Sequence, residues 1–157
     1  MHAAAKQRQV GQVLAEFALC LPIVVMLVFG LIDAGRAVFA YNSLARGARV
    51  GARYGAVYGG SQYAGGGFWT TTGNAAGTYA ASGVFAANTI VSRTALSVPG
   101  LDSDDLQVTI EGLGAPGYVF SQRTPVRVTV TYVFRPATPV FSGVPLTLSS
   151  AGTATIE

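Results

Sequence analysis

The sequence is poor in the residues that carry most enzyme chemistry. Among its 157 residues there is one histidine, His2, and only 11% of the residues are charged. A single histidine close to the N-terminus excludes a histidine-based catalytic triad and a zinc site built from several histidines. The charged fraction is less than half that of a typical soluble domain, which argues against a freely soluble protein. We therefore expect no enzyme activity, no cofactor, no metal site and no small-molecule substrate.

Cysteine is also scarce. The one cysteine, Cys20, lies inside an apolar run. Leu19 stands where a lipidation motif requires a small residue, so Cys20 is expected to be a small apolar side chain. With no second cysteine, no disulfide can form within the chain. The fold must then be held together by its own core, by neighbouring molecules, or by both.

A long apolar run near the N-terminus is the main feature that is present. Residues 13–32 carry one charge, Glu16. As a helix this run would be about 30 Å long, which matches the hydrocarbon core of a bilayer. Lys6 and Arg8 precede it, and basic residues on the short side of a span predict a cytoplasmic N-terminus. Everything after Ile32 is then expected to be exported from the cytoplasm.

Several short motifs in the first 55 residues resemble a known family. Gly11, followed at the fifth position by Glu16 and then by Phe17, resembles the cleavage motif of type IV prepilins. The longer series resembles the TadE-like pseudopilins of tight-adherence (Flp) pilus systems. Its motifs are Glu16-Phe17-Ala18-Leu19, Leu21-Pro22, Phe29-Gly30-Leu31-Ile32-Asp33, Gly35-Arg36 and Ala48-Arg49-Val50-Gly51-Ala52-Arg53-Tyr54.

This resemblance implies a processed membrane subunit. A prepilin peptidase would remove the basic leader, residues 1–11, by cutting after Gly11 and exposing the amine of Gln12. An ionised residue inside a membrane span costs on the order of 2.5–3.5 kcal/mol. The free amine of a neighbouring subunit would neutralise Glu16 and so set the register between subunits.

The resemblance also implies the partners and the place of the protein. The partners would be other pilins or pseudopilins, the inner-membrane pilus assembly platform and membrane lipid. The chain would be a single-pass protein of the bacterial cytoplasmic membrane, with an extracytoplasmic head and possible incorporation in a surface pilus. Major Flp pilins are generally very short, so the size of this head favours a minor subunit.

Removal of the leader also bears on nucleic-acid binding. The formal net charge is +3, and loss of Lys6 and Arg8 reduces it to about +1. Such a balance gives no electrostatic basis for a nucleic-acid partner. The alternative to a pseudopilin is an unprocessed, signal-anchored accessory or adhesion protein, which would retain its N-terminus.

The helical pattern continues beyond the membrane span. Residues 12–57 predict one helix of roughly 70 Å, which Pro22 is expected to kink or loosen. Small residues at four-residue spacing let another backbone approach closely, so we assign a helix-packing role to a set of glycines. This packing is either against the protein's own sheet or against a helix of another subunit. Gly47, Gly51 and Gly55 have this spacing, and Gly30 and Pro22 are assigned the same packing role.

A basic stripe lies on the same part of the helix. Arg46, Arg49 and Arg53 are spaced to share one helical face. We expect this face to be solvated; contact with anionic lipid headgroups or with an acidic partner is the alternative. Three arginines without interleaved aromatic residues do not make a nucleic-acid site.

Residues 58–157 predict an exported head. Residues 58–83 are rich in glycine and predict a long loop, whose Phe68-Trp69 pair is either a contact surface or a plug over the sheet. A second helix is expected over residues 81–96, with Ser82 as its cap. The acidic turn formed by Asp102, Asp104 and Asp105 is expected to be solvated rather than to bind calcium.

The rest of the head predicts strands. Alternation of apolar and polar residues indicates strands over residues 106–111 and 126–134, and a last strand follows over about 146–156. The expected fold class is α+β. A long N-terminal transmembrane, pilin-like helix carries a small C-terminal head made of a second helix and a three- to four-stranded antiparallel sheet.

Overall fold

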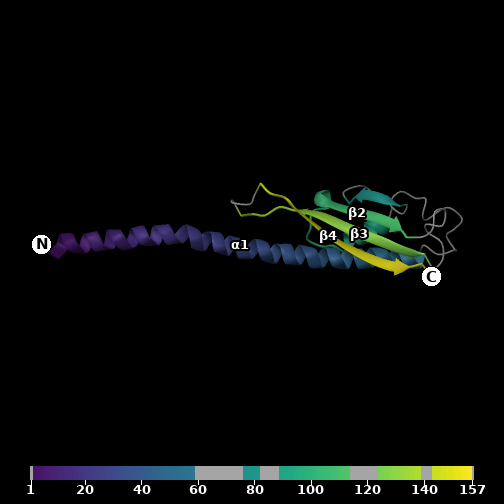
Figure 1. Ribbon diagram of the computed structural model, residues 1–157, viewed down its shortest axis with the longest axis horizontal. Coiled ribbons are helices and arrows are strands. Elements are labelled where there is room, and N and C mark those ends of the chain that lie inside the picture. Colours follow the sequence, from purple (N-terminus) through teal and green to yellow (C-terminus); the bar gives the residue numbers. More distant parts are fainter. Residues whose placement is uncertain (1, 59–75, 82–88, 114–123, 139–142, 157) are drawn as a thin grey trace.

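The computed structural model describes residues 2–58, 76–81, 89–113, 124–138 and 143–156. Figure 1 shows a rod with a head along one half of its length, and this confirms the expected α+β class. The elements are, in chain order, α1 (His2–Tyr58), β1 (Gly77–Ala80), α2 (Ile90–Leu96), the 3-10 helix η2 (Ser103–Asp105), β2 (Leu106–Gly112), β3 (Pro125–Phe134) and β4 (Leu146–Thr155).

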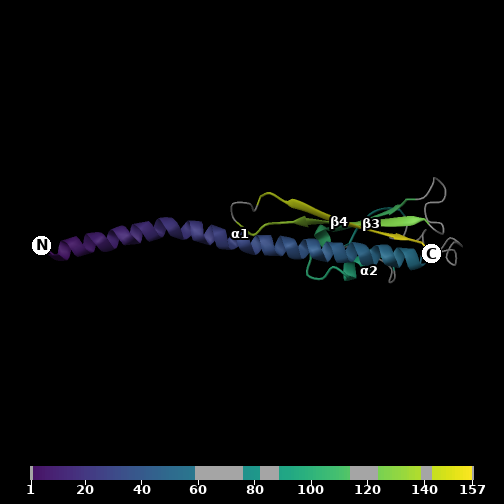
Figure 2. The same cartoon turned by 60° about the horizontal axis from the view of Figure 1, so that its bottom comes forward.

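Helix α1 is continuous through its single internal proline, Pro22. Proline lacks the amide hydrogen that would bond to the preceding turn, so a bend rather than a break is the expected consequence. Figure 2 shows α1 bending in its N-terminal half, the half that contains Pro22.

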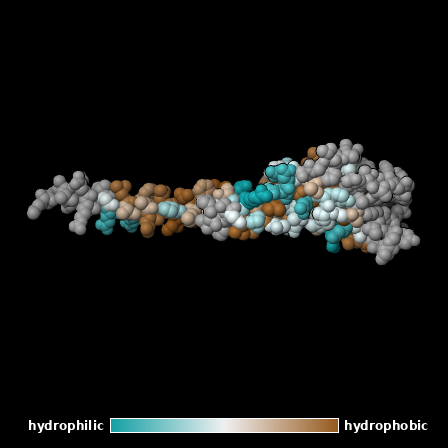
Figure 3. Space-filling view, turned by 90° about the horizontal axis from the view of Figure 1, so that it is seen from above, coloured by the Kyte–Doolittle hydropathy of each residue, from teal (hydrophilic) through white to brown (hydrophobic). Residues whose placement is uncertain are grey.

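The N-terminal half of α1 stands clear of the head. Figure 3 shows apolar side chains along the face of it that is in view, and residues such as Leu19 and Leu31 are more than 70% exposed. The helix is long and apolar enough to cross a membrane, and none of its most apolar stretch is buried in the chain. A fully exposed apolar helix of this length indicates a single-pass membrane anchor.

The sheet has the strand order β1-β2-β3-β4, and every neighbouring pair is antiparallel. Along β3 the buried residues alternate: Val126, Val128 and Val130 have no measurable exposure, whereas Arg127 is exposed. Figures 1 and 2 show the C-terminal half of α1 running along one face of this sheet. The alternation therefore directs one side of β3 toward the helix and the other away from it.

The core lies between α1, α2 and the sheet. Strand β4 approaches α1 so closely that a Cβ added to Gly152 would lie 2.5 Å from the carbonyl oxygen of Ala48. Direct backbone-to-backbone packing of this kind requires a residue without a side chain on the strand. The core residues include Leu44, Ala48 and Ala52 of α1, Ile90 and Val91 of α2, and Val108, Ile110, Val126, Val128 and Val130 of the sheet.

The second helix is shorter than expected. Helix α2 begins at Ile90, and Thr89 before it has an extended backbone and caps the helix by accepting a hydrogen bond from the amide of Ser92 at 3.1 Å. The expectation of one helix over residues 81–96 was therefore wrong, because Thr89 takes the N-cap role that was assigned to Ser82. Ser82 itself lies outside the described residues.

A fourth strand replaces part of the expected loop. Strand β1 lies within residues 58–83 and pairs with β2, with Thr78 opposite Thr109 and their hydroxyl oxygens 3.0 Å apart. Four residues, Gly-Thr-Tyr-Ala, are too few to show alternation in the sequence, and pairing with β2 defines the strand. Phe68 and Trp69 lie outside the described residues.

Candidate functional site

The residues of the expected processing site lie together on α1, away from the head. Gly11, Gln12 and Glu16 are all exposed, and a Cβ on Gly11 would meet nothing within 4 Å. Glu16 lies about 7.5 Å along the helix axis from Gly11. None of the ion pairs between described residues includes Glu16. A counter-charge for this carboxylate would have to come from outside the head.

A second carboxylate, Asp33, lies where the apolar run ends. It is only 8% exposed. The backbone amides of Ala137 and Thr138 donate hydrogen bonds to it at 3.0 and 2.8 Å, and the hydroxyl of Thr138 donates a further one. Asp33 thus ties α1 to the chain that follows β3, more than 100 positions later in the sequence.

Arg36, one turn further along α1, completes this junction. Its guanidinium donates to Asp33 at 3.1 Å and lies over the ring of Phe134, 5.3 Å from the ring centroid. The hydroxyl of Thr138, followed by the amide of Ala137, lowers the pKa of Asp33 from 3.8 to about 2, although burial opposes the shift. Asp33 is therefore ionised at neutral pH and acts as a fixed acceptor, not as a proton donor.

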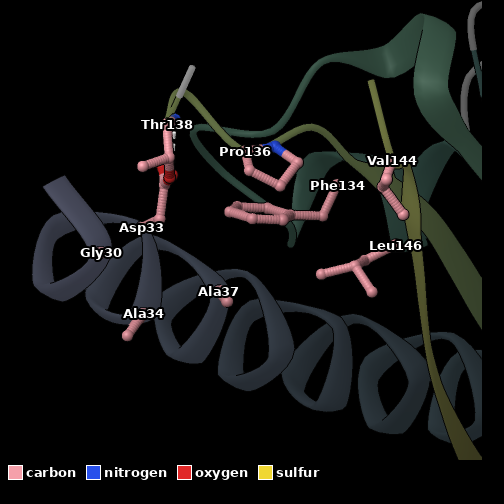
Figure 4. A pocket seen from close by; sticks show the side chains of 9 residues that line it. All are labelled: Gly30, Asp33, Ala34, Ala37, Phe134, Pro136, Thr138, Val144 and Leu146. Atoms are coloured by element: carbon pink, nitrogen blue, oxygen red, sulfur yellow. Dashed lines mark hydrogen bonds between the residues drawn. The ribbon is translucent and has the colours of Figure 1, made fainter. Parts of the chain in front are cut away.

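A groove of about 490 Å³ opens beside Asp33, between α1 and the chain that connects β3 to β4 (Figure 4). The residues from α1 are spaced to share one helical face. Among the described residues that line the groove, Asp33 is the only charged one, and its carboxylate is already hydrogen-bonded. The lining consists of Gly30, Asp33, Ala34, Ala37, Phe134, Pro136, Thr138, Val144 and Leu146.

The glycine stripe on α1 faces the protein's own head. Gly47, Gly51 and Gly55 are buried. A Cβ on Gly47 would collide with the side chain of Val98, and one on Gly51 with that of Thr94. Gly51 therefore lets α2 approach α1 closely, and Gly47 does the same for the residues that directly follow α2. Gly30 differs, because a Cβ there would meet nothing within 4 Å.

The arginine stripe stays on the surface. Arg46, Arg49 and Arg53 are all exposed, and a solvated face fits this position. Contact with lipid headgroups or with an acidic partner is compatible with the same exposure.

The acidic turn has structural partners of its own. The carboxylate of Asp102 accepts from the amide of Asp104 at 3.1 Å and caps η2. Asp105 pairs with Arg135 at 2.7 Å. Across the described ranges there is no cluster of three or more histidine, cysteine, aspartate or glutamate residues that could hold a metal ion.

Sequence reasoning treated Asp33 only as part of a motif and missed its role as an acceptor. The signal was present, because an acid directly after the 16 uncharged positions 17–32, with an arginine three residues later, indicates a partly buried carboxylate. What the sequence did not contain was the identity of the donors. Ala137 and Thr138 lie in a proline-rich connection without a periodic pattern.

A long apolar helix whose outer half is built into a small α+β head is the architecture of a single-pass, membrane-anchored protein. Residues 11–53 match the family model described as TadE-like protein, which covers somewhat more than a quarter of the chain. This match confirms the resemblance predicted from the motifs, and it associates the chain with a family of structural proteins of the Tad pilus. No curated protein and no solved structure matches the chain.

Proposed function

We propose that this protein is a TadE-like minor pseudopilin, a membrane-anchored structural subunit for the assembly of a tight-adherence pilus. The observation that carries the proposal is the family match over residues 11–53, which begins at the proposed cleavage residue Gly11. It falls on a helix whose most apolar stretch is not buried against its own head. An apolar surface of that kind needs lipid or other helices around it.

Processing and assembly are coupled through Glu16 in this proposal. A prepilin peptidase removes residues 1–11, and the new amine of Gln12 pairs with Glu16 of a neighbouring subunit. The exposure of Glu16 supports this, because the carboxylate is accessible to a group from another molecule. In a membrane an ionised side chain without a partner is costly. Subunits are therefore most stable at the axial offset that brings the amine of Gln12 next to Glu16 of the neighbour.

The position in the cell follows from the same arrangement. The N-terminus lies in the cytoplasm, α1 crosses the inner membrane once, and the head lies outside it, where other pilins and the assembly platform are the partners. A minor role fits a head of roughly 100 residues, since major Flp pilins are very short. Immunogold labelling of purified filaments tests this, and uniform labelling along the shaft would contradict a minor role.

The mass of the N-terminus tests processing. Protein extracted from membranes that contain the prepilin peptidase should begin at Gln12. Gly11→Ala should retain Met1, and the matched control Gly30→Ala, another exposed helical glycine, should be processed normally. An intact leader on the unmodified chain would instead identify the unprocessed accessory or adhesion protein.

Substitution of Glu16 tests the pairing. Glu16→Val and Glu16→Gln should leave membrane insertion intact and abolish copurification with other pilus subunits, because both remove the negative charge. Glu111→Gln serves as the control, since Glu111 is an exposed acid of the head, 3.8 Å from Arg127. Unchanged copurification of the Glu16 variants would refute the proposed register role.

A further inference from the structure

The apolar groove beside Asp33 lies at a particular depth relative to the predicted membrane span. Its residues on α1 run from Gly30 to Ala37. At about 1.5 Å per residue, Gly30 lies about 3 Å inside the end of the span at Ile32, and Ala37 about 7.5 Å beyond it. The headgroup layer of a bilayer is roughly 5–7 Å thick on each side. The groove therefore occupies the boundary between hydrocarbon and headgroups.

The far wall of the groove presents apolar side chains that nothing in the described part of the chain covers. Val144 is 58% exposed and Leu146 is 50% exposed, and Figure 4 shows both across the groove from Ala37. The free energy falls when an apolar group covers such side chains and displaces the water around them. The groove volume of about 490 Å³ lies in the usual range for sites that hold a small ligand.

The polar groups at the end of the groove are compatible with an apolar occupant. Asp33 accepts bonds from Ala137, Thr138 and Arg36, and so it does not need water from the groove. The guanidinium of Arg36 lies over the ring of Phe134, and Arg36 itself is not among the described residues that line the groove. An apolar chain can therefore enter without leaving an unpaired charge beside it.

We propose that this groove binds the acyl chain of a membrane phospholipid and so holds the base of the head against the outer surface of the bilayer. Lipid is the occupant that the position favours, because the lower end of the groove opens at the depth of the hydrocarbon itself. The inference rests on membrane anchoring by α1 and not on pilus assembly. Its failure would leave the pseudopilin role untouched, and the reverse also holds.

A photoreactive lipid tests the proposal. The full chain is placed in lipid nanodiscs, one chain per disc, with phosphatidylcholine that carries a diazirine in the middle of one acyl chain. Adducts are then mapped by mass spectrometry. Carbons in the middle of an unbound chain lie well below the headgroups, so an adduct on residues 143–146 requires the chain to rise into the groove. Adducts on residues 13–32 report insertion of the span.

Two phenylalanine substitutions provide the variant and its control. Ala37→Phe fills the groove and should lower the yield of adducts on residues 143–146 by about tenfold, the effect of losing contacts to about two methylene groups. Val38→Phe places the same side chain at a 61% exposed neighbour that does not line the groove, and should change nothing. Adducts on residues 13–32 should be equal in all three proteins.

Three results would overturn the proposal. The first is the absence of adducts on residues 143–146 while those on residues 13–32 form normally. The second is an equal yield in the unmodified chain and in Ala37→Phe. The third appears in discs that hold two chains: loss of the lipid adduct at residues 143–146, with the adducts on residues 13–32 unchanged, would assign the groove to a second copy.

Discussion

Replacement of Gly152 by alanine should damage the head more than any other single-methyl addition in β4. The new Cβ would lie 2.5 Å from the carbonyl oxygen of Ala48, 2.6 Å from its carbonyl carbon and 2.9 Å from the amide nitrogen of Arg49. All three atoms belong to the backbone of α1, so no side-chain rotation can relieve the collision. Either the helix or β4 has to move.

The expected cost follows from this rigidity. Added atoms in a packed core typically destabilise by about 1–3 kcal/mol, and contact with an unyielding backbone places Gly152→Ala at the upper end, about 3 kcal/mol. For a head of roughly 100 residues, this corresponds to a fall in melting temperature of about 12–24 °C. Differential scanning calorimetry of the full chain in detergent measures the unfolding of the head.

Gly143→Ala is the matched control. A Cβ at Gly143 meets nothing within 4 Å, so this variant should remain within about 0.5 kcal/mol of the original protein. Equal melting temperatures for Gly152→Ala and Gly143→Ala would refute the direct seating of β4 on the backbone of α1.

Three further perturbations follow from the same contacts. The pKa of Asp33 is lowered to about 2 in the fold, so its stabilising contribution is fully present above about pH 4 and is lost as the pH falls through 2. The difference in melting temperature between the original protein and Asp33→Asn should therefore shrink as the pH falls from about 4 to 2. A difference that stays constant with pH would contradict this. Gly51→Ala should lower the melting temperature, because the Thr94 hydroxyl it displaces donates to the carbonyl of Ile90 at 2.7 Å, whereas Gly30→Ala should not. Thr89→Ala should lower the free energy of unfolding measured by calorimetry by about 1 kcal/mol, because α2 loses its N-cap. An unchanged free energy of unfolding would show that Thr89 is not an effective cap.

Elements with a strong period were predictable from the sequence. The alternation of valines in β3 and the unbroken apolar and small-residue pattern of α1 each repeat often enough to define the element and the face that it buries. The predicted strand over residues 126–134 therefore differs from β3 by one residue at its start. Short elements gave no such repeat, so β1 was read as loop and the start of α2 was placed too early.

The polar junction at Asp33 was beyond prediction for a different reason. Its geometry depends on which backbone amides come within 3 Å of the carboxylate, and those amides belong to Ala137 and Thr138. Any residue except proline could supply a backbone amide, so side-chain identity does not specify the donor. Long-range contacts to the main chain are therefore much harder to infer from sequence than contacts between side chains.

The two carboxylates of α1 illustrate opposite ways of holding a charge near a membrane. Asp33 lies at the predicted boundary, and its own head supplies two amides, a hydroxyl and Arg36, so the charge is satisfied within one chain. Glu16 lies inside the apolar run, is exposed, and takes part in none of the ion pairs between described residues. A charge satisfied internally stabilises the monomer, whereas one that needs an external cation makes its stability depend on assembly. Under the proposed pairing with the amine of a neighbouring subunit, Glu16 would favour the assembled state over the free subunit, which Asp33 cannot do.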